Sequence, residues 1–150
     1  MSVADPVDLV RRLVAAANRG DVAAMRELLA PDHVDHPLTY DPPPLPGAEG
    51  DPVLERYEQA DANMRIDYPD MQIVLDEVLV CGDRVVSITT SRGTHAASGL
   101  PVTVRGISID RVADGKIVET WASWDRLGIY QQLGVVEPTS ALVTRAGLTP

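Results

Sequence analysis

The chain has no phenylalanine, and its 150 residues include only two tryptophans and four tyrosines. Its core must therefore be built from aliphatic side chains and methionine, so the position of each tryptophan becomes informative. The single cysteine, Cys81, excludes an intrachain disulfide and a cysteine-based metal cluster. Cys81 lies in an apolar run, where we expect a small, buried side chain.

Basic residues are also few, with 13 Lys and Arg against 22 Asp and Glu, for a formal net charge of −9. A field of that sign repels nucleic acid and anionic membranes, so neither is expected as a partner. No apolar run is long enough to span a membrane, and the N-terminus lacks the layout of a signal peptide. We therefore expect a cytoplasmic protein.

The order of secondary structure predicts one α+β domain over residues 1–136, followed by a flexible tail at 137–150. Helix-opening and helix-ending residues predict three N-terminal helices, over 5–20, 21–31 and 51–66. An extended entry at 32–36 separates the second helix from the third. From residue 71 the pattern changes to that of an antiparallel meander, with strands at 71–80, 84–94, 102–112 and 116–124. A short amphipathic helix follows Asp125.

The last two predicted strands meet at Asp114-Gly115, a strong hairpin signal, and the second ends close to Trp121, Trp124 and Asp125. If the indole rings desolvate the Asp125 carboxyl, its pKa rises toward the range in which it can give and take a proton. Alternatively, Asp125 only caps the helix that begins at Arg126. Both interpretations remain open on the sequence.

The three histidines suggest substrate contacts rather than a metal site. His33 and His36 are three residues apart, so on a strand they point to opposite faces and cannot readily bind one ion. We predict that His36 hydrogen bonds a substrate oxygen, or else that it is a satisfied edge residue. His95 follows a strand end and suits a proton carrier or a substrate donor, with an exposed loop histidine as the alternative.

Strand alternation leaves two candidates for the face that lines a pocket. One combines polar with apolar side chains, which is the mixture that a ligand cavity needs. Its members are Ser108, Asp110, Ile117, Trp121, Ser123 and Asp125. The other is the face of Arg105, Ile107 and Ile109, with Arg105 reaching inward. No phosphate loop, nucleophile elbow or zinc-protease pair is present, which leaves acid–base chemistry on a small molecule without a cofactor.

Several short segments follow one another in a characteristic order between about residues 7 and 136. They are Asn18-Arg19-Gly20-Asp21, Val34-Asp35-His36, Tyr68-Pro69-Asp70-Met71, Gly82-Asp83-Arg84, Arg92-Gly93-Thr94-His95, Arg105-Gly106-Ile107, Asp114-Gly115-Lys116-Ile117-Val118-Glu119 and Gln131-Gln132-Leu133-Gly134. Together they resemble SnoaL-like proteins, the polyketide (ester) cyclase family.

The resemblance implies a nuclear-transport-factor-2-like cone, in which a curved antiparallel sheet packs on three N-terminal helices and encloses an apolar pocket. It also implies ring closure by aldol condensation, with an aspartate as general acid/base and no metal. His36 and His95 sit at the two histidine positions of the family. Many relatives read His-Trp-Asp after Lys-Ile-Val-Glu, whereas this chain has Thr120-Trp121-Ala122. The family acid therefore corresponds either to Ala122 or to Asp125.

These observations predict a cofactor-independent cyclase or isomerase that acts on a small hydrophobic, polycyclic or polyketide-like substrate. Its predicted catalytic residues are Asp125 as acid/base, with His95 and His36 at the enolate oxygen. Its predicted substrate contacts are Arg105, Asp110, Trp121, Trp124, Tyr40 and Tyr57. The alternatives are a hydrolase or a pericyclic-type cyclase in the same pocket, a non-catalytic binding protein, or a scaffold for dimerisation. A homodimer is expected in each case.

Overall fold

The structure, a computed structural model, describes residues 5–37 and 64–149. Helix α1 (Pro6–Arg19) begins after Asp5, whose Oδ1 accepts a hydrogen bond of 3.0 Å from the backbone N–H of Val7. It ends at Gly20, whose φ of 66° is a left-handed value that glycine adopts without strain. Both ends of α1 are as predicted.

Helix α2 (Val22–Leu28) begins at the predicted cap, where the Asp21 carboxylate accepts a hydrogen bond of 3.0 Å from the N–H of Ala24. It ends three residues before the predicted end at Pro31, because the first strand already begins at Leu29. Most of the predicted third helix lies outside the described residues, and residues 64–67 at its end are helical.

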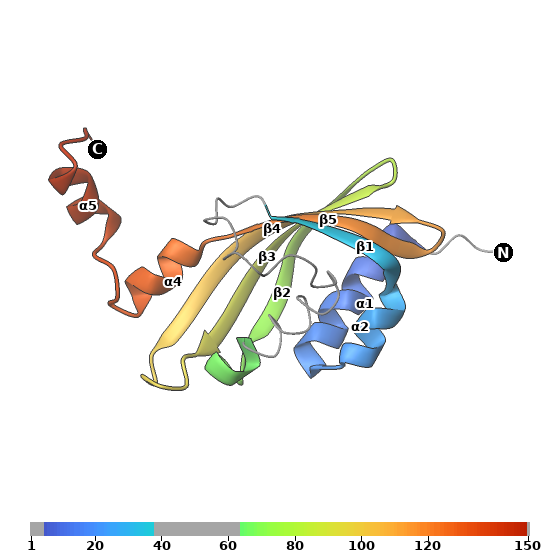
Figure 1. Ribbon diagram of the computed structural model, residues 1–150, viewed down its shortest axis with the longest axis horizontal. Coiled ribbons are helices and arrows are strands. Elements are labelled where there is room, and N and C mark those ends of the chain that lie inside the picture. The colour runs from blue at the N-terminus through green and yellow to red at the C-terminus, as the bar shows by residue number, and fades with distance from the viewer. Residues whose placement is uncertain (1–4, 38–63, 150) are drawn as a thin grey trace, which may run out of the picture.

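Five strands form one curved, open sheet in the order β1-β5-β4-β3-β2 (Figure 1). Their bounds are β1 Leu29–Pro37, β2 Gln72–Cys81, β3 Arg84–Thr94, β4 Pro101–Ala113 and β5 Lys116–Trp124. Strands β2 to β5 form the predicted antiparallel meander and match their predicted ends to within one residue. Strand β1 is longer than the extended entry predicted at 32–36. It pairs in parallel with β5, so the sheet is mixed rather than wholly antiparallel.

Helices α1 and α2 lie against one side of this sheet, which we call the inner face; the opposite side is the outer face (Figure 1). Leu9, Leu28, Leu29 and Ile117 form the core between helices and sheet, and each is no more than 5% exposed. Full burial of a side chain of this size contributes about 1.5–3 kcal/mol. At the other end of α1, the Asn18 amide accepts a hydrogen bond from the Ile73 N–H (2.8 Å) and donates one to the Ile73 carbonyl (2.9 Å).

A bulge in β5 changes which of its side chains share a face. The β4–β5 register shifts between Arg111 and Val112, so that β5 carries one extra residue. As a result Ile117 and Thr120 are both buried, although strict alternation would place residues three apart on opposite faces. Strict alternation predicted one face for Ile117 and Trp121, and the bulge makes that grouping wrong.

The C-terminal segment contains two short helices. Helix α4 (Arg126–Gln132) was predicted, whereas α5 (Thr139–Arg145) lies within the stretch expected to be a tail. Glu137 connects the two helices, because its carbonyl accepts a hydrogen bond from the Gln131 side chain and its carboxylate pairs with Arg145. In Figure 1, α5 projects away from the sheet, and none of its residues is buried.

Cys81 is exposed, so the expectation that it is buried is wrong. It is the last residue of β2, which is an edge strand, and the Gly82 turn follows directly. No helix in residues 5–37 or 64–149 is long and apolar enough to cross a membrane.

Candidate active site

A chain of hydrogen-bonded polar side chains crosses the inner face from β1 to β3. We call it the inner polar stripe, and its members are His33, Thr120, Asp110, Ser108 and Ser87. Four of the five are buried and Ser108 is half-buried. Buried polar groups of this kind are stable only when they are hydrogen-bonded to one another.

Thr120 connects the histidine to the acid. Its hydroxyl donates to Asp110 Oδ1 over 2.6 Å and lies 3.0 Å from His33 Nε2. A hydroxyl has one proton, and Thr120 gives it to Asp110 Oδ1, which can accept it whether or not the other carboxyl oxygen carries a proton. It must then accept from His33, which places the ring proton of a neutral His33 on Nε2. On the other side, Ser108 Oγ donates to Asp110 Oδ2 over 3.3 Å and lies 2.8 Å from Ser87 Oγ.

Asp110 is the acid at the centre of the stripe, and its side chain is only 3% exposed. Burial disfavours its charged form and raises the pKa of its carboxyl above the ordinary value of 3.8. The hydroxyls of Thr120 and Ser108 act in the opposite direction, and the negative charge of Asp35 adds to the rise in the pKa. Asp110 therefore keeps its proton to a higher pH than an exposed aspartate does.

His33, at the β1 end of the stripe, is 2% exposed, and burial lowers its pKa below the ordinary 6.5. The nearby Asp35 raises that pKa, but the effect of burial is larger. A neutral imidazole at neutral pH agrees with the role of donor to Thr120 that the hydrogen-bond directions require.

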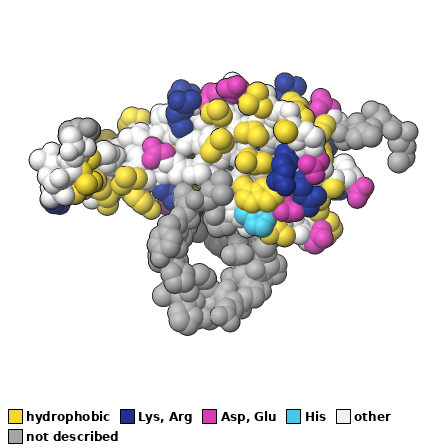
Figure 2. Space-filling model, turned by 90° about the horizontal axis from the view of Figure 1, so that it is seen from above, with side chains coloured by type: hydrophobic (Ala, Val, Ile, Leu, Met, Phe, Trp, Pro, Cys, Tyr) yellow, Lys and Arg dark blue, Asp and Glu magenta, His cyan; other side chains and the backbone are white. Residues whose placement is uncertain are grey.

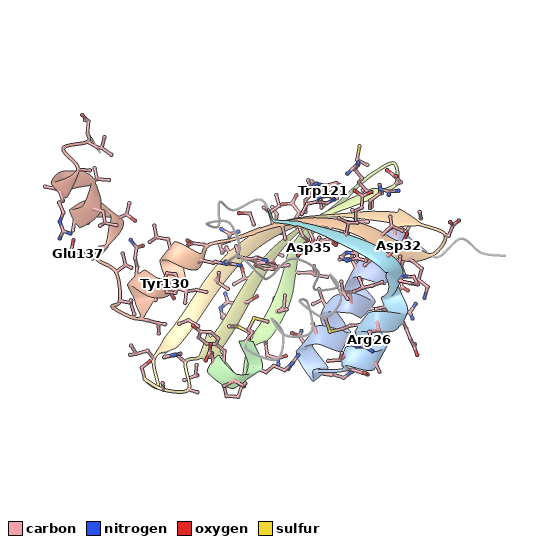
Figure 3. The ribbon with its side chains drawn as sticks, in the orientation of Figure 1. Arg26, Asp32, Asp35, Trp121, Tyr130 and Glu137 are labelled. Atoms are coloured by element: carbon pink, nitrogen blue, oxygen red, sulfur yellow. The ribbon has the colours of Figure 1, made fainter. Side chains whose placement is uncertain are left out.

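Asp35 lies on the same face beside the stripe. It pairs with Thr120 across the β1–β5 ladder, and paired residues point to the same side of a sheet. Figure 3 labels Asp35 below the sheet, on the inner side, and Trp121 above it. The Asp35 side chain is half-buried, so it is more accessible than Asp110.

The rest of the inner face beside the stripe is mainly apolar. Trp124 lies flat against Gly106, where an added Cβ would be only 2.1 Å from Trp124 Cε3. Ala122 and Trp124 are half-buried, which leaves part of this surface open to a ligand. The buried Thr89 hydroxyl has no hydrogen-bond partner among the residues that the structure describes. An apolar surface with a few polar groups is typical of small-molecule sites.

Of the residues predicted from the sequence, Asp110 and Trp124 lie on this inner face. The predicted grouping with Ser123 is wrong, because Asp110 pairs with Thr120 and Ser108 pairs with Ala122. The alternative face, with Ile107 and Ile109, is the outer one, and Ile107 is 42% exposed.

His36 and Trp121 lie on the outer face, where their rings stack with centroids 4.6 Å apart. His36 Nε2 lies 3.2 Å from Glu119 Oε2, and the Arg84 guanidinium lies 4.7 Å from the centre of the Trp121 ring. The prediction that His33 and His36 face opposite sides of one strand is confirmed. No group of three or more His, Cys, Asp or Glu within the described ranges is arranged to hold a metal.

His95 lies in the β3–β4 turn, where its Nδ1 is 2.7 Å from Ser98 Oγ. Ladder pairing across the sheet connects His36 and Trp121 to Val86 on β3. His95 follows β3 and is about 30 Å further along the chain direction of that strand than Val86. The structure therefore does not bring the two predicted histidines together.

Asp125 is exposed, and its Oδ1 accepts a hydrogen bond of 2.8 Å from the N–H of Gly128. The interpretation as a helix cap is confirmed, and the expected desolvation of this carboxyl is wrong. Arg105 is exposed on β4, and its carbonyl accepts from the Asp125 N–H. The predicted contacts Tyr40 and Tyr57 lie outside the described residues.

Sequence reasoning missed His33, Asp35 and Thr120 as site residues. His33 and Asp35 have strand spacing, and a strand that begins at Leu29 would have placed them on one face. For Thr120 no such pattern exists, because the extra residue in β5 changes the face of Thr120 and leaves no mark in the sequence.

Comparison with known proteins gives one family and a consistent fold. The family model for SnoaL-like polyketide cyclase matches residues 7–133. IdmH from Streptomyces antibioticus, described as a proposed polyketide cyclase, is 31% identical, with a TM-score of 0.73 over 87% of this chain and 99% of that one. A proposed polyketide cyclase from Bacillus cereus is 27% identical, with a TM-score of 0.73 over 87% and 81% of the two chains.

A third similar structure, AclR from Streptomyces galilaeus, is described as a proposed hydroxylase. It is 22% identical, with a TM-score of 0.76 over 97% of this chain and 92% of that one. At this identity the similarity concerns the fold alone. A protein from Catenulispora acidiphila with the ketosteroid isomerase-like fold also matches. No curated protein matches the sequence.

The lowered pKa of His33 predicts a loss of stability in mild acid. Below pH 6.5 the unfolded chain binds a proton at His33 that the folded chain does not. The contribution of neutral His33 is present above pH 6.5 and is lost as the pH falls toward the folded pKa. His33→Gln should therefore show a shallower fall in the free energy of unfolding between about pH 7 and pH 5, measured by urea denaturation. Equal slopes in both proteins would contradict the assignment.

Proposed function

Since the chain belongs to the SnoaL-like polyketide cyclase family, whose model matches residues 7–133, we propose a cofactor-independent cyclase or isomerase of hydrophobic, polyketide-like ketones. The protein is an enzyme of this family type. We assign the role of general acid/base to Asp110. The observation that carries the proposal is the buried Asp110 carboxyl within the inner polar stripe.

The position of Ala122 supports the choice of Asp110 over Asp125. Ala122 pairs with Ser108 and faces inward, so the position where relatives carry an acid is on the inner face but holds only a methyl group. Asp110 is the next inward residue along β4 from Ser108. Asp125 lies beyond the end of β5 and is engaged as a helix cap. We therefore propose that Asp110, one inward ladder position away from the Ser108–Ala122 pair, replaces the acid that relatives carry at the position of Ala122.

The proposed chemistry follows from the raised pKa of the Asp110 carboxyl. Aldol-type ring closure requires removal of a proton next to a carbonyl, while negative charge develops on the carbonyl oxygen. A carboxylic acid that is kept neutral by burial can donate a hydrogen bond, or its proton, to that oxygen. The half-buried Ala122 and Trp124 on the same inner face give apolar contacts that a polyketide-like substrate needs.

We predict that the wild-type protein catalyses α-proton exchange of 2-tetralone, a bicyclic ketone, in deuterated buffer. The rate is measured by proton NMR above the buffer-catalysed background. Asp110→Asn keeps the shape of the site but removes the transferable proton, so it should lower the rate by about 10²–10⁴-fold. Asp125→Asn should keep the wild-type rate.

Loss of exchange in Asp125→Asn alone would instead support the role first predicted for Asp125. Unchanged exchange in Asp110→Asn would contradict our assignment. Binding of 2-tetralone by the wild type without any exchange would favour a cyclase that acts by shape, or a carrier.

We also propose that the protein is a homodimer formed through the outer face. Apolar side chains cross the sheet there, and Leu79 and Ile107 are 55% and 42% exposed. The apolar residues on this face include Val34, Leu79, Val86, Ile88, Ile107, Ile109 and Trp121. Figure 2, which looks onto this face, shows apolar side chains gathered over the strands with charged groups beside them. Contiguous apolar surface of this kind is uncommon on monomers, and a second copy covers it by symmetry.

Ile107→Lys should abolish this dimer, because it places two charges in the apolar centre of the interface. Ile66→Lys, at a site that is 71% exposed and outside the sheet, is the matched control and should remain dimeric. Sedimentation equilibrium gives the mass of each protein. A dimeric Ile107→Lys variant would exclude the outer face as the interface.

A further inference from the structure

We propose that Asp35 is a second catalytic residue, the base that removes the α-proton, and that Asp110 delivers its proton to the substrate oxygen through the Ser108 hydroxyl. The proposal rests on the function proposed above and extends it from one acid to a pair of carboxyl groups.

The sheet register places the two acids on either side of Thr120. Asp35 on β1 and Asp110 on β4 both pair with Thr120 on β5. Two strand spacings separate their backbones, about 10 Å, and all three side chains share the inner face. The register thus places the two acids on the two strands that flank β5, at the level of Thr120.

The two acids differ in exposure, and this difference assigns their roles. Asp35 is half-buried, whereas Asp110 is 3% exposed. Burial favours the protonated form of a carboxyl group, which makes Asp110 the proton donor of the pair and Asp35 the base. The influence of Asp35 on Asp110 agrees with this assignment, because the Asp35 charge raises the pKa of Asp110.

Ser108 connects the buried acid to the ligand surface. It is half-buried, its hydroxyl lies 3.3 Å from Asp110 Oδ2, and it faces inward opposite Ala122. When Asp110 carries its proton on Oδ2, the acid donates along this contact, so Ser108 can give its own proton to the substrate oxygen while it accepts another from Asp110. Ser87, 2.8 Å from Ser108 Oγ, holds that hydroxyl in place.

The proton transfers balance without any other reactant. Asp35 takes the α-proton, the electron pair of the C–H bond forms the enol double bond, and the carbonyl oxygen takes a proton from Ser108, which regains one from Asp110. In ring closure, the enol carbon then attacks a second carbonyl, whose oxygen takes the proton from Asp35. The enol proton returns through Ser108 to Asp110. The pair ends in its starting state.

The test is the exchange of 2-tetralone in Asp35→Asn, with Asp32→Asn as the matched control. Asp32 lies on the same strand and is exposed. Asp35→Asn should lower the maximal exchange rate by about 10²-fold or more, with little change in KM, and Asp32→Asn should keep the wild-type rate. Asp35→Glu restores a carboxylate and should recover part of the rate, which a merely structural role of Asp35 would not explain. Urea denaturation checks that each variant is folded.

The outcomes separate this inference from the proposed function. Exchange that is lost in Asp110→Asn but kept in folded Asp35→Asn would overturn the role of Asp35 alone. No exchange by the wild type would overturn the proposed acid–base function and this inference with it. Equal losses in Asp35→Asn and Asp35→Glu would also overturn the assignment of Asp35 as the base.

Discussion

One extra residue in β5 determines which side chains meet on the inner face. The bulge turns Thr120, Ala122 and Trp124 inward and leaves Glu119 and Trp121 outside. Thr120 can then hydrogen bond both His33 and Asp110, so the inner polar stripe depends on this irregularity. Without it, the two tryptophans would exchange faces, and a charged glutamate would face the core.

The burial of Asp110 is unfavourable for folding and favourable for chemistry. A carboxylate removed from water destabilises the folded state unless hydroxyls or a bound proton compensate. The donors around Asp110 are neutral hydroxyls, and no cation contacts it among the described residues. Neutral donors leave its pKa raised, whereas an arginine would lower it. This arrangement suits an acid that must hold a proton near the substrate, and it distinguishes Asp110 from Asp125, which backbone hydrogen bonding holds at a helix end.

The sequence predicted the strands of the meander, the helix caps and the fold family, because these follow from local signals such as Asp5-Pro6 and Asp114-Gly115. It also placed Asp110 and Trp124 in the site. It could not place Trp121, because a bulge reverses face parity without changing composition. It left open whether Asp125 caps the helix at the end of β5 or is desolvated, and the cap is what the structure shows. The parallel pairing of β1 with β5 joins residues about 85 positions apart, and no local pattern records such a contact.

The most direct test of this account is the carboxyl titration of Asp110, followed by carbon-13 NMR and assigned by comparison with Asp110→Asn. A carboxyl group that is buried among neutral hydroxyls and beside a second acid should titrate above its ordinary pKa of 3.8. A midpoint above that value would support Asp110 as an acid whose proton burial retains to a higher pH. A midpoint at or below it would mean that hydrogen bonding outweighs burial, and it would contradict the role of Asp110 as the proton donor.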